Sequence, residues 1–145
     1  MMKLSEKGRF AVRPKLVGPA ESIACNVERW PSVHARTHWQ LGDERIVDGA
    51  DFYVEDRELG HLHLFPEAHI AMPPALRRAL IAAKLARPFR WNESFVVQRV
   101  QTSSEAQAAE WLFHLAYDHL QGVDLASLLE RVAQRVSLGA IPTHV

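Results

Sequence analysis

The chain has 145 residues, 48% of them hydrophobic, which is enough to bury one core and predicts a single domain over residues 1–145. Lysine plus arginine and aspartate plus glutamate both number 17, so the chain lacks the basic excess that neutralises nucleic-acid phosphates. We therefore expect no nucleic-acid partner.

No apolar run approaches the roughly 20 residues that a membrane-spanning helix needs, and the first ten residues lack the apolar core of a signal peptide. The single cysteine, Cys25, excludes an internal disulfide and is typical of a reducing compartment. These features predict a soluble, cytoplasmic protein without a membrane partner. Within it, Cys25 is expected to be a small apolar helix residue rather than a reactive thiol.

The N-terminal segment, residues 1–15, mixes charges with few apolar residues and predicts an extended arm. Over residues 20–30 the apolar side chains recur at helical spacing, and Pro31 ends this helix. The helix is amphipathic, so we expect it to lie on a sheet.

Residues 32–40 alternate between apolar and polar side chains, which predicts a strand with one polar face. His34 and His38 fall on that face. Because alternation alone explains both histidines, we expect them to be solvated rather than to act as ligands.

Two short strands are predicted next, over residues 45–47 and 51–54. Turns at residues 41–43 and 48–50 would connect them, and the Asp-Gly pair of the second turn is a strong hairpin signal. The first half of the chain is thus predicted to be a meander of strands.

Residues 56–72 hold three of the eight histidines and predict two adjacent strands. A connecting loop of odd length separates polar from apolar side chains, and we favour residues 66–68 for this loop. The polar face then carries His61, His63 and His69. The buried face carries Leu62, Leu64, Ile70 and Met72.

The same alternation predicts the faces on which two neighbouring charged residues, Arg57 and Glu58, lie. Arg57 is expected on the histidine face, where it would contact an anionic ligand. Glu58 alternates away from His61 and is not expected to touch either imidazole of the pair.

A helix is predicted to begin at the Pro73-Pro74 pair, because proline suits the first helical turn, and to run to about Ala86. Phe89 and Trp91 follow it and are predicted to contact a ligand. The next strand, residues 94–101, has apolar side chains on both faces, which is typical of a central strand.

The last two predicted elements are helices. Thr102 and Glu105 have capping-box spacing and open the main core helix. Asp124 caps the final helix, residues 125–136, which Gly139 closes. Strands followed by helices predict an α+β domain, with an antiparallel sheet of about five strands and helices packed on one face.

The clustered chemistry consists of three histidines. His61 and His63 stand side by side on one strand and are the predicted catalytic residues, as proton-handling or ligand-orienting groups. His69 is a predicted ligand contact. The three imidazoles would also suit zinc, copper, iron or nickel if they converge, although no metal ligand is assigned from the sequence. His114 is expected to be a boundary residue outside the site.

Five segments resemble the luciferase-like domain family, which joins small uncharacterised bacterial proteins to the fungal luciferases. They are RELGHLH (57–63), MPPALR (72–77), LIAA (80–83), FVV (95–97) and WLFHLAY (111–117). The likeness covers roughly residues 48–120, and its most specific piece is Arg-Glu-Leu-Gly-His-x-His. Where the family tends to carry a pair of histidines after the first long helix, this chain has Phe89 and Arg90.

The resemblance implies an α+β domain and, for the fungal branch, oxygenation of a phenolic pyrone without a known bound cofactor. It predicts a small-molecule-binding protein or enzyme, here a cofactor-independent oxygenase-like one acting on a phenolic or carboxylate compound. The cofactor is left unassigned, and so is catalysis itself. One alternative is a non-catalytic interaction module that self-associates into a homo-oligomer, and a second is a histidine-ligated metalloprotein. A concave pocket on the histidine face would favour the first hypothesis.

Overall fold

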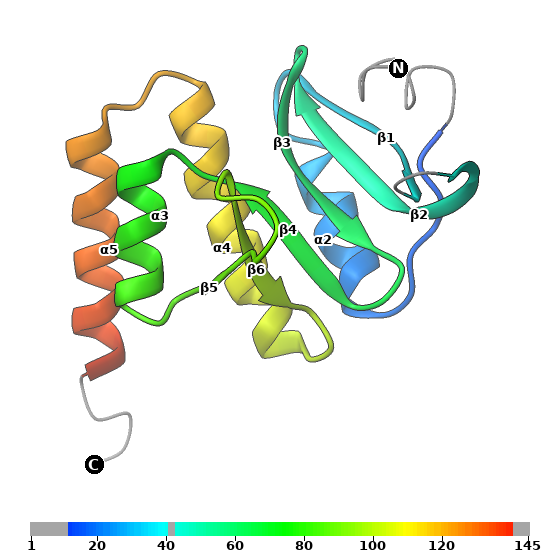
Figure 1. Ribbon diagram of the computed structural model, residues 1–145. Helices are drawn as coiled ribbons and strands as arrows, with labels where there is room; N and C mark the ends of the chain where they lie inside the picture. Colours follow the sequence, from blue (N-terminus) through cyan, green and yellow to red (C-terminus); the bar gives the residue numbers. More distant parts are fainter. Residues whose placement is uncertain (1–11, 41–42, 141–145) are drawn as a thin grey trace.

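An antiparallel sheet of six strands carries the fold of the part of the chain that the computed structural model describes, residues 12–40 and 43–140 (Figure 1). The strands are β1 (Val33–Gln40), β2 (Asp43–Val54), β3 (Arg57–His63), β4 (Glu67–Ala71), β5 (Arg87–Pro88) and β6 (Phe95–Arg99). Their spatial order is β1-β2-β3-β4-β6-β5, and every pair is antiparallel. The predicted α+β class is confirmed, with six strands rather than about five.

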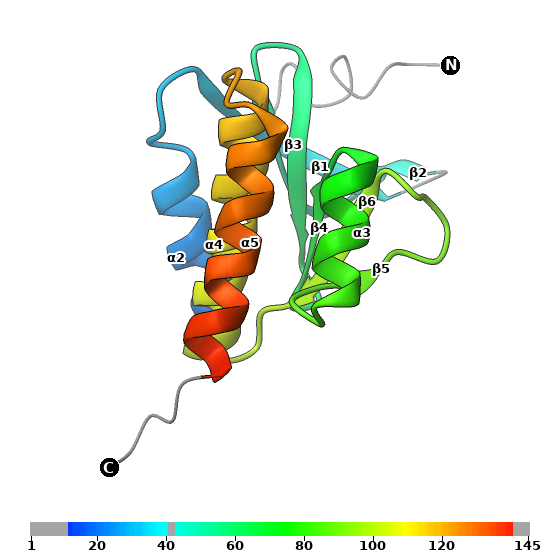
Figure 2. The same ribbon diagram turned by 90° about the vertical axis from the view of Figure 1, so that its left-hand side faces the viewer.

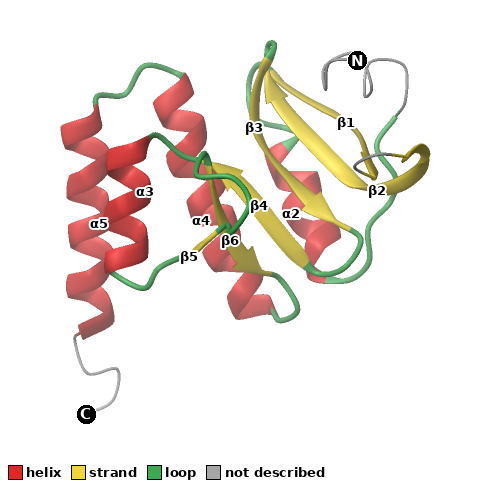
Figure 3. Ribbon diagram, viewed as in Figure 1, coloured by secondary structure: helices red, strands yellow, loops and turns green. Residues whose placement is uncertain are grey.

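Helices cover one face of this sheet (Figures 2 and 3). They are α2 (Pro19–Val27), α3 (Pro74–Ala82), α4 (Ser103–Leu120) and α5 (Leu125–Ala140). Helix α4 contacts β3, β4 and β6, while α5 packs against α3 and α4. Phe113 of α4 meets Phe52 of β2 edge to face at 5.8 Å, in the centre of the core. None of these described helices combines the length and the apolar character that crossing a membrane would require.

Strand β2 is one continuous strand, so the predicted hairpin turn at residues 48–50 is wrong. Gly49 instead lies within the sheet, opposite His38 of β1 and His63 of β3. Its φ of 145° and the close approach of β3 explain the glycine, because a Cβ there would lie 1.8 Å from the carbonyl oxygen of Leu62. The other predicted turn includes residues 41–42, which lie outside the described residues.

The predicted caps at the starts of α4 and α5 are confirmed, but α2 ends at Val27 rather than at Trp30, and α3 ends at Ala82 rather than at about Ala86. Thr102 and Glu105 form the predicted capping box, with reciprocal hydrogen bonds of 3.1 Å. The Asp124 carboxylate accepts a hydrogen bond of 3.1 Å from the backbone N–H of Ser127, as expected of a cap. Helix α5 does not close at Gly139, however, but runs through it to Ala140, so Gly139 lies in the last described turn of the helix.

An arginine fastens the described part of the N-terminal arm to α2. The guanidinium of Arg13 lies 2.8 Å from carboxylate oxygens of both Glu21 and Glu28. Its hydrogen bond is the main cause that lowers the pKa of Glu21 to about 2. Cys25 donates a hydrogen bond from Sγ to Glu21 at 3.1 Å, and the carboxylate raises the pKa of the thiol. A raised pKa keeps the thiol protonated, in keeping with the expectation that Cys25 is unreactive.

Replacing Gly49 by alanine should destabilise the protein by about 3 kcal/mol or more, since the added methyl group would meet backbone atoms that have no room to move. The matched control is Gly139→Ala on α5, where a Cβ would meet open space. That change should stabilise the helix by about 0.5–1 kcal/mol. Urea unfolding of the two variants measures both effects, and equal stability of the two would refute the close approach at Gly49.

Replacing Arg13 by alanine should lower the free energy of unfolding at pH 7 by about 2 kcal/mol, because two charge-assisted contacts are lost. The folded-state pKa of Glu21 lies below its ordinary value, so the stabilisation is complete above about pH 4.5 and is lost as the pH falls toward 2. Urea unfolding at several pH values should therefore show the difference from wild type shrinking in that window. A stability difference between Arg13→Ala and wild type that does not change with pH would contradict this account. So would an equal loss of unfolding free energy in the exposed control Arg78→Ala.

Candidate functional site

Three side chains form a row across the centre of the sheet, on the face opposite the helices. Asp51 of β2 pairs with His61 of β3, which pairs in turn with His69 of β4. Directly paired residues on neighbouring strands point to the same side, so this register brings the three together. His63 joins them because it lies two residues from His61 on the same strand.

Two imidazoles of this group, His61 and His63, each direct a ring nitrogen at the third, His69. Nδ1 of His69 lies 3.2 Å from Nε2 of His61 and 3.1 Å from Nε2 of His63. All three side chains are buried. The odd loop parity predicted from the sequence is therefore confirmed, because an even loop would have sent His69 to the other face.

Each of these imidazoles turns its other ring nitrogen to a carboxylate. The pairs are His61 Nδ1 with Glu58 at 3.1 Å, His63 Nδ1 with Asp48 at 2.8 Å, and His69 Nε2 with Glu67 at 2.9 Å. An ionised carboxylate only accepts hydrogen bonds, so it fixes the tautomer of the ring that donates to it.

A fourth imidazole, His38 of β1, completes the group that we name the histidine cluster: His38, His61, His63 and His69. Its ring stacks on His61 with 4.2 Å between centroids, and its side chain is 13% exposed. Nδ1 lies 2.7 Å from Oδ1 of Asp51, at an angle outside that of a hydrogen bond. The expectation that His38 is solvated is wrong, whereas His34 is exposed as expected. The alternation within β1 could not show that side chains of β2 and β3, Asp51 and His61, pack against His38.

A bulge in β3 explains why two sequence assignments failed. Phe52 pairs with Gly60 but Tyr53 pairs with Glu58, so Leu59 is the extra residue. Glu58 therefore turns to the histidine face and Leu59 enters the core.

The same bulge turns Arg57 away from the site. Its guanidinium donates a hydrogen bond of 2.7 Å to the carbonyl oxygen of Leu120, on the helical side of the sheet. The predicted position of Arg57 on the histidine face is therefore wrong.

The loop between β3 and β4 lies two residues earlier than predicted. It comprises residues 64–66 instead of 66–68, since β3 ends at His63 and β4 begins at Glu67. Leu64 was expected in the core but lies in this loop and is 53% exposed. The adjacent Phe65 stacks on His63 at 4.4 Å between ring centroids.

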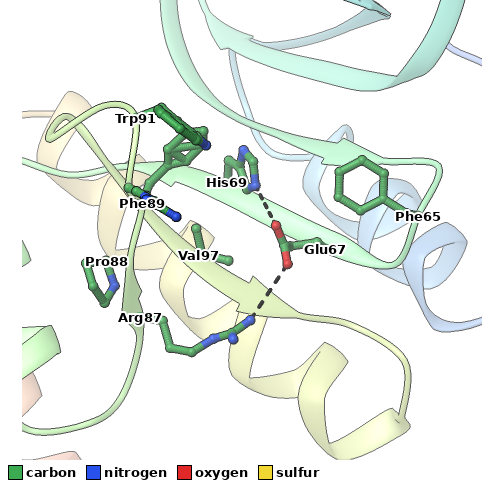
Figure 4. A pocket seen from close by; sticks show the side chains of 9 residues that line it. Phe65, Glu67, His69, Arg87, Pro88, Phe89, Trp91 and Val97 are labelled. Carbon is green, nitrogen blue, oxygen red and sulfur yellow. Dashed lines mark hydrogen bonds and ion pairs between the residues drawn. The ribbon is translucent and has the colours of Figure 1, made fainter.

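The histidine cluster forms the floor of a cavity of about 400 Å³. The remaining lining residues are Trp39, Asp48, Glu58, Phe89, Trp91, Asn92 and Phe95. A second cavity of about 630 Å³ adjoins it and shares His69, Phe89 and Trp91 (Figure 4). Figure 4 shows Glu67 between His69 and Arg87, with Phe65 and Trp91 on either side of His69. Aromatic rings thus rim both cavities.

Five predicted site residues line the first cavity together: His61, His63, His69, Phe89 and Trp91. Their roles stay predictions. His114 lies elsewhere, exposed on α4 and 5.2 Å from the ring of Trp30.

Sequence reasoning missed His38 and four carboxylates of the site, Asp48, Asp51, Glu58 and Glu67. The carboxylates gave no usable signal, because acidic residues near strand ends are common on solvated surfaces.

Burial lowers the pKa of two histidines of the site and raises the pKa of two of its carboxylates. It lowers the pKa of both His61 and His63 to about 3, with further lowering by neighbouring imidazoles. Burial also acts to lower the pKa of His38, but Asp51 and other carboxylates outweigh it and raise that pKa. Burial raises the pKa of Asp51 and Glu58. At neutral pH His61 and His63 are therefore neutral, and each offers one N–H and one lone pair.

Alanine substitutions of two leucines, Leu59 and Leu64, test the bulge in β3 and the position of the following loop. Leu59→Ala should cost about 2–5 kcal/mol of stability because Leu59 is fully buried, although plain alternation would place it on the histidine face. Leu64→Ala should change stability by less than about 0.5 kcal/mol. Urea unfolding of both variants decides the matter, and a reversed order of the two costs would refute the register of β3.

Comparison with protein families matches residues 56–116 to the family described as Luciferase domain. This segment contains β3, β4, β6 and most of α4, whereas His38, Asp48 and Asp51 lie before it. A comparison with curated proteins found no match, and neither did a comparison with solved structures. The segment that supplies His61, His63 and His69 is thus similar to the Luciferase domain family, as its motifs predicted.

Proposed function

We propose that this chain is an oxygenase-like enzyme that binds a phenolic or carboxylate small molecule in the cavity above the histidine cluster. The observation that carries the proposal is the make-up of this cavity. Its volume of about 400 Å³ suits a single-ring or double-ring compound, and it has polar groups on one wall and aromatic groups on the others.

The aromatic wall suits a planar ligand. Phe89, Trp91 and Phe95 line the cavity, and Phe89 stands edge to face with His69 at 4.4 Å between ring centroids. Aromatic rings prefer such offset and edge-to-face contacts, which orient a bound ring. A phenol placed here would direct its hydroxyl group to the imidazoles of the floor.

The adjoining cavity supplies positive charge for a carboxylate. Arg87 and Arg90 both line it, and the guanidinium of Arg90 lies 5.1 Å from the ring centre of Trp91. Guanidinium groups bind carboxylates in a fork geometry. These two arginines take the part that the sequence assigned to Arg57.

The alternative of a self-associating interaction module predicts a histidine face that is flat or covered by another subunit. The concave, aromatic-rimmed cavity favours the small-molecule hypothesis.

A direct test is titration of chelator-treated protein with simple phenols and aromatic carboxylates, followed by tryptophan fluorescence and calorimetry. Trp91→Ala should weaken binding of the best compound by about 3- to 10-fold, since one aromatic contact is worth about 0.5–1.5 kcal/mol. Trp91 is 79% exposed, so its loss should leave the fold intact. Oxygen uptake with that compound then tests the oxygenase-like activity.

The matched control is Leu138→Ala, which removes an exposed apolar side chain on α5, outside both cavities. It should bind with wild-type affinity. If no compound of either class binds, or if the two variants bind alike, the proposed site is refuted.

A further inference from the structure

Three nitrogens of the histidine cluster lie close together: Nε2 of His61, Nε2 of His63 and Nδ1 of His69. The number of N–H groups available to them decides whether they can hydrogen-bond to one another. A neutral imidazole has one N–H and one lone pair. His61, His63 and His69 each direct one nitrogen to a carboxylate, which can only accept while it is ionised. In neutral rings each N–H is thereby committed outward, which leaves the lone pairs of His61 Nε2 and His63 Nε2 facing that of His69 Nδ1 at 3.2 Å and 3.1 Å.

Facing lone pairs in a buried place repel one another unless an electron-pair acceptor lies among them. A metal ion with nitrogen ligands at about 2.0–2.1 Å in tetrahedral geometry holds those nitrogens about 3.3 Å apart. The separations of His69 Nδ1 from His61 Nε2 and from His63 Nε2, 3.2 Å and 3.1 Å, are within about 0.2 Å of that spacing.

We propose that Nε2 of His61, Nε2 of His63 and Nδ1 of His69 bind a divalent first-row transition-metal ion. Imidazole donors suit zinc, copper, iron and nickel, and they exclude a magnesium or calcium site, which would need oxygen ligands. All three ligands line the cavity of about 400 Å³, so a remaining coordination position faces the space where a small molecule would lie.

Carboxylates hydrogen-bond to the ring nitrogens that point away from the proposed metal ion. Metal-bound histidines usually donate their second N–H to a carboxylate, which orients the ring and raises its basicity. Here Glu58, Asp48 and Glu67 do so for the three rings in turn. Glu67 also lies 3.7 Å from the guanidinium of Arg87, which links the site to the adjoining cavity.

His38 gives the site a further nitrogen. One of its nitrogens lies within 4.8 Å of a nitrogen of His61 and of one of His63. Nδ1 of His38 and Oδ1 of Asp51 are the two buried polar side-chain atoms among the described residues that have no hydrogen-bond partner.

Metal binding goes beyond the proposed function and is measured with no organic compound present. The ligand titration described above uses chelator-treated protein. Failure of either experiment therefore leaves the result of the other intact.

The test is titration of the full-length apo protein with Co²⁺, whose visible d–d absorption reports nitrogen coordination in low symmetry, followed by displacement with Zn²⁺. We expect saturation at one equivalent per chain and a raised melting temperature, since binding to the folded state stabilises it by mass action. His69→Ala should abolish the cobalt spectrum. Asp48→Asn and Glu67→Gln keep every imidazole and should weaken Co²⁺ binding by about 10- to 100-fold.

The matched controls are the histidine variants His34→Ala and His114→Ala, whose side chains are exposed and outside the cavity. Both should bind Co²⁺ as the wild type does. Absence of saturable binding, retention of the spectrum by His69→Ala, or unchanged affinity in both carboxylate variants would each overturn the proposal. In that case protons shared among the imidazoles, rather than a metal ion, would separate the lone pairs.

Discussion

The pairing of β3 with β2 and β4 is the constraint on which the site depends. Each side chain of a strand points to one of the two faces of the sheet. A register shift of one residue therefore moves all side chains of that strand to the opposite face. In this chain the pairing aligns His61 between Asp51 and His69. The single bulge at Leu59 then reverses the faces of the residues before it. One backbone irregularity thus gives His61 its carboxylate partner and gives the core another leucine.

Much of the fold could be predicted because it follows from local signals: apolar spacing in α2, the capping box of α4 and the alternation in β1. Polarity alone also gave the odd loop that unites His63 with His69. What failed depended on partners distant in sequence. Glycine at position 49 looks like a turn, but its positive φ serves a close approach between strands. Nothing near His38 in the sequence reveals that Asp51 and His61 will lie beside it.

The site draws on two parts of the chain with different relations to the family. The matched segment supplies His61, His63 and His69 together with Phe89, Trp91 and Phe95 of the aromatic rim. The strands before it, β1 and β2, supply His38 and two of the carboxylates. The family segment therefore brings the converging nitrogens, while the preceding strands set their surroundings: how deeply they are buried and which charges lie near them.

The two edges of the sheet differ in their capacity to pair with another strand. At one edge β5 has only two residues, and the second, Pro88, has no backbone N–H to donate. Such a short edge offers too few backbone groups to template an incoming chain. At the other edge of the described sheet β1 is eight residues long, so among the described strands it is the edge that offers more backbone groups for strand addition. Association of copies through this edge would then place a second copy beside β1, the strand that carries His38 and Trp39 of the cavity lining.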